Sequence, residues 1–413
     1  RRIQRRATKL HAQISQHVDT GKAGGEGGIG GNLSVRADVT KNQNVSALGG
    51  AYEDGSAGAA AAASLSTSHA TAAVNGMVNA EGGIIIAADS QATKNDTSAS
   101  ASAGSGAISG MLVGATNSVI DWMETKMKKT PDPRSGSSLT FKLSGAVAYA
   151  DHDSFATAGI GDAAQVASQL ETSSAPVQDG IRISADVTEV PEMSAISFVN
   201  SDTLEAKGGN TAENSISAAV VIGDYTNQAK AGIGKNAVVN AKNPITVTSK
   251  TYVPQDVPWN HFDSSTTMDV VESIGTYLKD SFNTNVGLQN HFFTSWSQSM
   301  AQGTITAVAG SVNVLDIHNT SQVLIDEGAS VNQDAAYRST MQDVKVTAVN
   351  ETQSLNLSGL FGFANLKDFL AVAFPGKVNP TVTPTTGGVG GSGLYTGYDN
   401  QVTAEIKKDA KVH

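Results

Sequence analysis

The stretch AVVIGDYTNQAKAGIGKNAVVNAKNPITVTS, residues 219–249, decides the fold because later parts of the chain repeat it. A shift of 92 positions places Val220 on Val312 and Ile233 on Ile325 without a gap, and other residues of the stretch match in the same way. A shift of 173 positions places Tyr225 on Tyr398. Ungapped self-similarity of this kind is typical of repeat architectures, which bury a continuous core by stacking similar units.

Short runs of alternating apolar residues recur with the repeat. LSVRADVT at residues 33–40 matches IRISADVT at 181–188, and related runs lie at 84–88, 245–249 and 344–348. Alternation predicts strands with one buried face. We expect strands of three to five residues, repeating about every 20 residues and stacked at roughly 4.8 Å. The sequence therefore predicts an all-β fold, a parallel β-helix (solenoid) with short α-helical insertions. It favours this over an antiparallel sandwich, which rarely repeats without gaps.

The chain divides into two kinds of segment. Coils of the β-helix are expected over residues 1–106, after a basic, Gly-rich start, and over 136–251, 304–353 and 391–413. The insertions are expected at 107–135, 252–303 and 354–390, with helices over about 107–131, 268–282 and 288–300. Loosely helical spacing also favours a helix over residues 1–20. The Ala/Ser-rich segments 55–73 and 98–110 are expected to form ordered coils with minimal side chains.

Aromatic residues are concentrated in the insertions, which hold all three tryptophans and eight of the eleven phenylalanines. A thin β-helix core has little room for rings, so we expect them on protrusions that pack against its flank or form a contact surface. The candidates for that surface are Trp122, Trp259, Phe292, Phe293, Trp296, Phe361, Phe363 and Phe369.

Polar residues at repeated positions are expected to shape turns. Asn227, Asn319 and Asn400 align through the repeat, as do Asp224 and Asp316. Asparagine tolerates left-handed backbone angles and bonds to neighbouring backbone, which suits a coil corner. We therefore predict structural turn residues here and not a ligand site.

Composition excludes several classes of function. The net charge is −10 and the basic residues cluster only at the very start, so the sequence offers no electrostatic case for nucleic-acid binding. There is no cysteine, hence neither a disulfide nor a thiolate metal site. No apolar run is long enough for a membrane-spanning helix. No cofactor or metal site is predicted, and the chain is expected to be an internal piece of a longer protein.

Catalytic motifs are likewise weak. GEGGIG at residues 25–30 satisfies a dinucleotide-binding pattern but precedes a strand and not a helix. Asp151, His152 and Asp153 alternate faces if extended, so they favour a polar turn. The chain is therefore predicted not to be an enzyme. A carbohydrate-active β-helix enzyme is the catalytic alternative, and its acids would come from Asp186, Asp202, Glu205 and Asp224.

Three segments carry a resemblance to a known family: residues 309–332, residues 219–241 and the run NHFFTSWSQSMAQG at 290–303. They resemble the large filamentous adhesin or haemagglutinin-like exoproteins of the fusobacterial leukotoxin type. The resemblance implies a right-handed β-helix that is exported through an outer-membrane partner and displayed at the bacterial cell surface. It implies an adhesive stalk with a host-cell or surface receptor, protein or glycan, and self-association into fibres. The first alternative to this role is a secreted leukotoxin-like cytotoxin, and the carbohydrate-active enzyme is the second.

Overall fold

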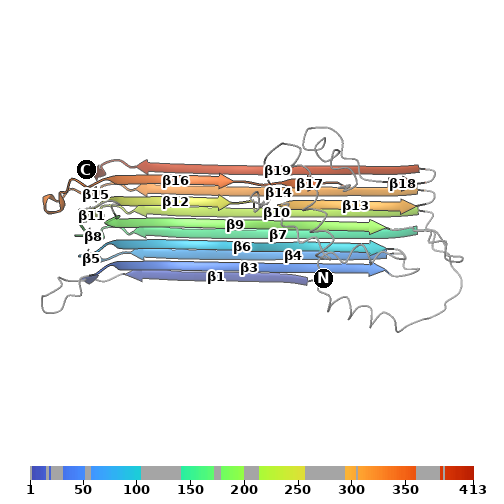
Figure 1. Ribbon diagram of the computed structural model, residues 1–413, viewed down its shortest axis with the longest axis horizontal. Coiled ribbons are helices and arrows are strands. Elements are labelled where there is room, and N and C mark those ends of the chain that lie inside the picture. Colours follow the sequence, from blue (N-terminus) through green and yellow to red (C-terminus); the bar gives the residue numbers. More distant parts are fainter. Residues whose placement is uncertain are drawn as a thin grey trace, which may run out of the picture.

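The described part of the chain is nearly all parallel β-sheet (Figure 1). The computed structural model describes residues 2–14, 18–19, 31–51, 57–103, 141–171, 178–199, 214–255, 294–303, 306–359, 382–384 and 387–413. Across these ranges the single helical element is a 3-10 turn, η2 (Ala335–Tyr337). No helix in this part of the chain has the length and apolarity needed to cross a lipid bilayer.

The strands form three sheets, which we call A, B and C. Sheet A contains β1 (Arg2–Ile14), β4 (Ala57–Val74), β7 (Phe141–Ile160), β10 (Asn214–Ile233), β14 (Thr306–Ile325) and β19 (Gly387–Ile406). Sheet B contains the short strands β2 (Val18–Asp19), β5 (Met77–Ala80), β8 (Gln165–Ser168), β11 (Val238–Ala241), β15 (Ser330–Val331) and β20 (Lys411–Val412). Sheet C contains β3 (Leu33–Ala51), β6 (Ile84–Ala103), β9 (Ile181–Val199), β12 (Ile245–Val253), β13 (Ser295–Gly303), β16 (Val344–Thr352), β17 (Asn356–Ser358) and β18 (Val382–Pro384).

The chain visits the sheets in the order A, B, C, and every neighbouring pair of strands is parallel. Measured between paired residues of sheet A, one such circuit takes from 60 residues, between Arg2 and Ala62, to 92 residues, between Asn214 and Thr306. The predicted period of about 20 residues is therefore wrong. So is the predicted strand length of three to five residues, because β4, β6, β7, β10, β14 and β19 have 18 to 20 residues each.

The register of the sheets confirms the sequence repeat. β10 and β14 pair Val220 with Val312, the shift of 92 positions, and β14 then pairs Asn319 with Asn400 on β19. In sheet C, β3, β6 and β9 align Leu33, Ile84 and Ile181, the starts of three of the matching runs. Each repeated residue therefore lies directly above its counterpart.

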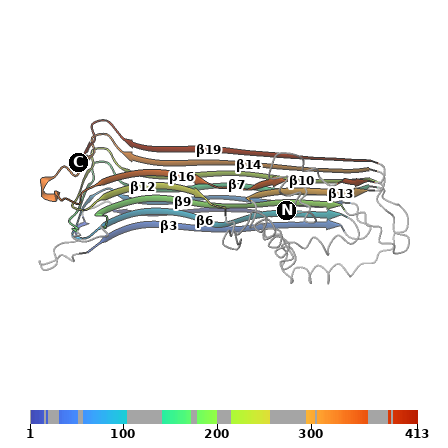
Figure 2. The same ribbon diagram turned by 45° about the horizontal axis from the view of Figure 1, so that its top comes forward.

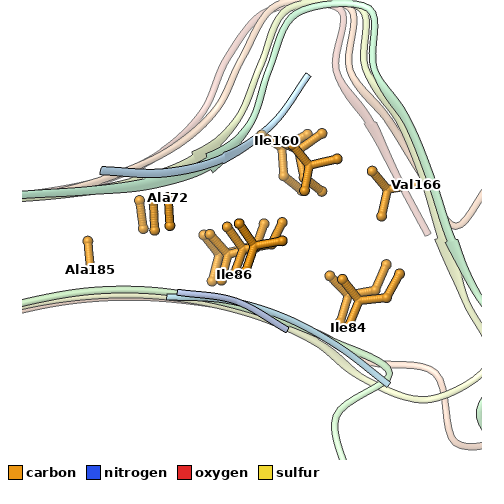
Figure 3. Close-up of a cluster of buried hydrophobic side chains, with 14 of the residues drawn as sticks. Ala72, Ile84, Ile86, Ile160, Val166 and Ala185 are labelled. Atoms are coloured by element: carbon orange, nitrogen blue, oxygen red, sulfur yellow. The ribbon is translucent and has the colours of Figure 1, made fainter. Parts of the chain in front are cut away.

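The interior is a wedge. Branched side chains including Ile84, Ile86, Ile160 and Val166 fill the wide end beside sheet B, whereas alanines such as Ala72 and Ala185 lie where sheets A and C approach each other (Figure 3). Small side chains let two sheets come close without voids. The described parts of the Ala/Ser-rich segments are ordered, since β4 covers residues 57–74 and β6 reaches residue 103, while residues 55–56 and 104–110 lie outside the described residues.

The corners between sheets A and B are shaped by left-handed residues. Four residues here have positive φ angles: Ala163 (55°), Asn236 (56°), Gly328 (70°) and Asp409 (60°). Each is followed directly by an alanine, and the repeat aligns these alanines. Glycine, asparagine and aspartate adopt this conformation at little cost, whereas alanine pays for its Cβ. These four residues, and not the predicted asparagines, are the corner residues of this part of the chain.

The predicted helices fail wherever the structure describes them. Residues 2–14 form strand β1, because Leu10, Ala12 and Ile14 alternate at period two and pair with Ala70, Ala72 and Val74. Residues 295–300 of the predicted helix 288–300 lie in strand β13. Parts of the insertion predicted at 354–390 lie in strands β17, β18 and β19. The helices predicted at 107–131 and 268–282 lie outside the described residues.

Strand β13 also changes the boundary of the aromatic-rich insertion. β9 pairs with β12 through Ile181–Thr188 and with β13 through Met193–Val199, so two strands take the place of one long strand in sheet C. Residues 295–303 therefore belong to the sheet, although the segment 252–303 is predicted as one insertion.

Candidate functional site

A buried polar cluster lies between the long sheets, and Glu189 is at its centre. Lys41, Gln43, Asn95 and Glu189 come from sheet C, while Ser64, Ser66, His152 and Ser154 come from sheet A. All of them are less than one tenth exposed. The apolar core consists mainly of two clusters of buried side chains, and on strand β3 one contains Val39 and the other contains Val45. The polar cluster lies between them. The cluster therefore places charged and polar groups between two apolar parts of the core.

A β-bulge in β6 creates the site. Inward-facing residues have even numbers up to Ala92 and odd numbers from Asn95, whereas β3 and β9 keep odd numbers inward throughout. The register shifts at this point against both neighbours, because β6 contains one more residue. Pro191, which lacks a backbone N–H, is the β9 partner of Asn95. Bulges re-aim side chains, and this one turns Asn95 into the interior.

A small residue allows the central ion pair to form. Lys41 and Glu189 lie on β3 and β9, and Ala92 of the intervening strand β6 pairs with both of them. Because Ala92 has no bulk beyond its Cβ, the two long side chains meet above it. Lys41 Nζ lies 3.2 Å from Glu189 Oε2, and it also donates to Ser66 Oγ at 3.1 Å.

Glu189 collects the contacts of the cluster. Its carboxylate accepts hydrogen bonds from Ser154 Oγ at 2.8 Å and from Asn95 Nδ2, and His152 Nδ1 lies 3.2 Å from its Oε1. Burial by itself would raise the pKa of Glu189, but Lys41, His152 and Ser154 outweigh burial and lower the pKa to about 2. The carboxylate is therefore charged at physiological pH.

Ser64, His152 and Glu189 contact one another in the order of a serine–histidine–carboxylate triad, which we call the relay. Ser64 Oγ is 2.8 Å from His152 Nε2, whose ring contacts Glu189 through Nδ1. The hydroxyl hydrogen of Ser64 is also directed at Gln43 Oε1, and one hydrogen serves only one acceptor. Ser64, His152 and Glu189 each have no exposed surface. A substrate from solvent therefore cannot reach the relay, and the chemistry open to the cluster is proton transfer and reaction among its own side chains.

The predicted asparagines form a ladder and not a set of corners. Asn227, Asn319 and Asn400 occupy the middle of β10, β14 and β19, where Asn227 Nδ2 donates to Asn319 Oδ1 at 2.9 Å and Asn319 Nδ2 donates to Asn400 Oδ1 at 3.0 Å. Asn227 and Asn319 are buried. The turn prediction is wrong because these positions face inward in an unbroken strand, where stacked amides bond to one another.

Asp224 and Asp316 also lie within strands, on the outer face of sheet A. They align with Asp151 of β7, so three carboxylates follow one another across the sheet. Burial, and after it the neighbouring Asp151 and Asp316, outweigh His318 and raise the pKa of Asp224. The prediction that Asp151 and Asp153 share a face opposite His152 is confirmed, but the three residues lie in strand β7 and not in a turn.

The two described acids of the four considered for a carbohydrate-active enzyme lie on different sheets. Asp186 belongs to sheet C, Asp224 belongs to sheet A, and Asp202 and Glu205 lie outside the described residues. A shallow hollow over Gly159 and Gly232 on sheet A has a single carboxylate in its lining, that of Asp326. The described residues also contain no group of three or more His, Asp or Glu side chains that could hold a metal ion.

Most of the predicted aromatic contact surface lies outside the described residues, namely Trp122, Trp259, Phe292, Phe293, Phe361, Phe363 and Phe369. Trp296 is described and is not an exposed contact residue, because it is 1% exposed within β13 and its Nε1 donates to the Gly359 carbonyl at 3.5 Å; it fits the alternative expectation that these rings are packed. A ring at this position is packed and cannot meet a partner.

The buried polar cluster is absent from the sequence prediction, although one signal for it exists. The two matching runs that end in ADVT are followed by Lys41 in one and by Glu189 in the other. Lys41 and Glu189 both have odd numbers, like the other inward-facing residues of their strands. Opposite charges therefore occur at positions where the alternating pattern predicts apolar residues. Aligned charges of opposite sign at inward positions indicate a buried ion pair.

The fold and the cluster define an all-β protein of parallel sheets with a polar centre closed to solvent. No family model, no curated protein and no solved structure matches the chain.

Proposed function

We propose that the chain is a stretch of right-handed parallel β-helix that serves as a structural and adhesive stalk at the bacterial cell surface. The observation that carries the proposal is the register: β4, β7, β10, β14 and β19 stack in parallel with the repeated residues aligned. Three parallel sheets visited in cyclic order are the strand arrangement of a β-helix. Export through an outer-membrane partner rests on the sequence resemblance.

A stalk needs stiffness along the stack, and the interior supports that role. Each added circuit extends the backbone hydrogen-bond ladders of sheets A, B and C by one strand, at about 4.8 Å per strand. The asparagine ladder adds side-chain bonds in the same direction, from Asn227 to Asn319 to Asn400. The sealed polar cluster and the narrow core leave little space for a soluble substrate, which favours a structural role over a catalytic one.

The adhesive surface that we propose is the outer face of sheet A. Exposed apolar side chains occur in neighbouring rows over its last four strands: Leu143, Val147, Ile222, Val312, Val389 and Tyr395. The aspartate row of Asp151, Asp224 and Asp316 borders them. Contiguous exposed apolar residues with a charged border are typical of interaction sites. A receptor with an apolar surface and a basic margin would complement this face.

Binding of the purified chain to host cells tests the proposal. We expect the fluorescently labelled chain to attach to cells, and we expect Ile222→Lys combined with Val312→Lys to reduce attachment at least tenfold. Thr40→Lys combined with Thr188→Lys, on the outer face of sheet C, is the matched control and should leave attachment unchanged. Absence of attachment by the parent chain would contradict the adhesive role. Lysis of leukocytes in its place would favour a leukotoxin-like cytotoxin.

A further inference from the structure

The buried polar cluster contains a nucleophile, an amide and a carboxylate that contacts both. Lys41 Nζ lies 3.2 Å from Glu189 Oε2, and Asn95 Nδ2 donates to Glu189 Oε1. A lysine amine attacks a carbonyl carbon once it has lost a proton, and an amide carbon accepts the attack once its nitrogen can leave with a proton. One carboxylate is thus placed to take the first proton and supply the second.

The backbone places the two reacting groups on adjacent strands. Gln43 of β3 pairs with Asn95 of β6, and Lys41 is two residues before Gln43 on the same inward face. Diagonal neighbours on a sheet face are about 7–8 Å apart at the backbone, which is within reach of a lysine side chain. The bulge in β6 is the reason that Asn95 faces Lys41 and Glu189, since without the extra residue Lys94 would point inward.

From this geometry we infer that Lys41 and Asn95 form an intramolecular amide cross-link between β3 and β6, with Glu189 as the catalytic residue. Glu189 takes a proton from the Lys41 ammonium group, and Nζ attacks Cγ of Asn95. The Nζ–Cγ bond forms, the Cγ–Nδ2 bond breaks, and Nδ2 leaves with the proton held by Glu189. Ammonia takes up the remaining amine proton, so the products are a secondary amide and an ammonium ion, and Glu189 is regenerated as a carboxylate.

Other groups of the cluster support this assignment over its competitors. The Oδ1 atom of Asn95 is buried and has no hydrogen-bond partner, so the amide is held by Glu189 alone. Glu189 itself is a poor electrophile because its neighbours keep it ionised. Gln43 is the other amide of the cluster and a competing electrophile, but it contacts Ser64 and lies on the same strand as Lys41. His152 and Ser154 are positioning residues, since each contacts the carboxylate.

Enclosure adds to the reactivity of the pair. Lys41 is 2% exposed, and Asn95 and Glu189 have no exposed surface, so water does not compete for the amide carbon. Two reactants held in a fixed geometry react far faster than the same groups in free solution. The proposal stands apart from the adhesive function, since it concerns the chain's own side chains.

Mass spectrometry of the full purified chain tests the cross-link. We expect the intact mass to be lower than the sequence mass by one ammonia molecule. Trypsin should no longer cut after Lys41, and the peptide that contains Lys41 should be joined to the peptide that begins at Asn95. Lys41→Arg, Asn95→Ala and Glu189→Gln should each restore the full sequence mass, while the outward-facing controls Lys94→Arg and Asn44→Ala should keep the reduced mass.

The parent chain alone can overturn the proposal, so the result does not depend on whether the variants fold. A folded chain of full sequence mass that trypsin cuts after Lys41 would contradict it. So would loss of water with a peptide joining Lys41 to Glu189, because the electrophile would then be Glu189. Loss of ammonia located at the Asn75–Gly76 bond would indicate an ordinary cyclic imide and also exclude the cross-link.

Discussion

Ile183 offers a direct test of the wedge-shaped core. Its side chain is fully buried, between Ile86 of β6 and Val247 of β12 in the register of sheet C. Figure 3 shows Ile86 among the stacked branched side chains at the wide end of the interior. Replacing Ile183 by alanine removes three carbon atoms from this column and leaves the neighbouring rows in place.

The expected cost follows from the burial. Three carbon atoms at about 0.8 kcal/mol each give a transfer free energy of about 2.4 kcal/mol. The cavity left by the side chain adds to this cost, because Ile86 and Val247 are held by their own strands and cannot close the space. We therefore expect the free energy of unfolding to fall by about 3–4 kcal/mol. The measurement is equilibrium urea denaturation of the full chain, followed by circular dichroism.

Ile222→Ala is the matched control. Ile222 is 38% exposed on the outer face of sheet A, so the same substitution should cost less than about 1 kcal/mol. Equal losses in the two variants would refute the assignment of inward and outward faces. A loss confined to Ile222→Ala would show that the faces are reversed.

Three further outcomes follow from the corners, the asparagine ladder and the aspartate row. Ala163→Gly should stabilise the fold by about 1 kcal/mol, because alanine at φ 55° carries the Cβ strain that glycine lacks, and Asn236→Ala should destabilise it by a similar amount. Both are measured by denaturation, and a destabilised Ala163→Gly would exclude corner strain. Asn319→Leu should cost about 1–3 kcal/mol, since the buried Nδ2 of Asn227 loses its acceptor, while His318→Leu on the outer face should cost little. Equal costs would count against the ladder. The pKa of Asp224 is raised above 3.8 by burial first and then by Asp151 and Asp316, so the folded state binds this proton more tightly and loses stability as pH rises above 3.8. Asp224→Asn should therefore be more stable than the parent at neutral pH and no more stable below pH 3.8, and a pH-independent difference would contradict the argument.

The sequence predicts the register of the sheets but not the length of the strands. Matching residues such as Val220 and Val312 identify which strands pair, because stacked positions share one environment. The strand length is missed because the inward positions of β4 change from Val74 through Ala72 and Ala70 to serines. Alanine and serine do not alternate visibly in hydrophobicity, so most of each strand resembles low-complexity sequence.

Period-four spacing explains the wrong helices. Leu10 and Ile14 are four residues apart, as are Trp296 and Met300, and this spacing fits a helix as well as one face of a strand. The serines at 295, 297 and 299 all face inward in β13, but a period-two pattern of polar residues is not read as a strand. These segments form strands and not helices because they are buried between two closely spaced sheets, which their short side chains allow.

The candidate site escapes prediction for a related reason. The cluster is assembled across both sheets from residues up to 148 positions apart, Lys41 and Glu189, and it depends on a bulge that no local motif announces. The turn preference of asparagine predicts corners, yet Asn227 faces inward like Tyr225 and Ala229, two residues away on either side. Parity along a strand is therefore a better guide to this interior than residue type. Figure 2 shows the strands of sheet C lying side by side, from β3 through β6, β9 and β12 to β16.

The distance between β4 and β19 tests the parallel in-register stack most directly. Register places Thr67, Asp153, Thr226, His318 and Asp399 in one outward-facing row across five strands of sheet A. The chain has no cysteine, so Thr67→Cys combined with Asp399→Cys accepts two spin labels at these positions alone. Double electron–electron resonance should give a narrow distribution consistent with a backbone separation of about 19 Å, which is four spacings of about 4.8 Å. A broad distribution, or a separation beyond about 30 Å, would contradict the stack and with it the proposed stalk.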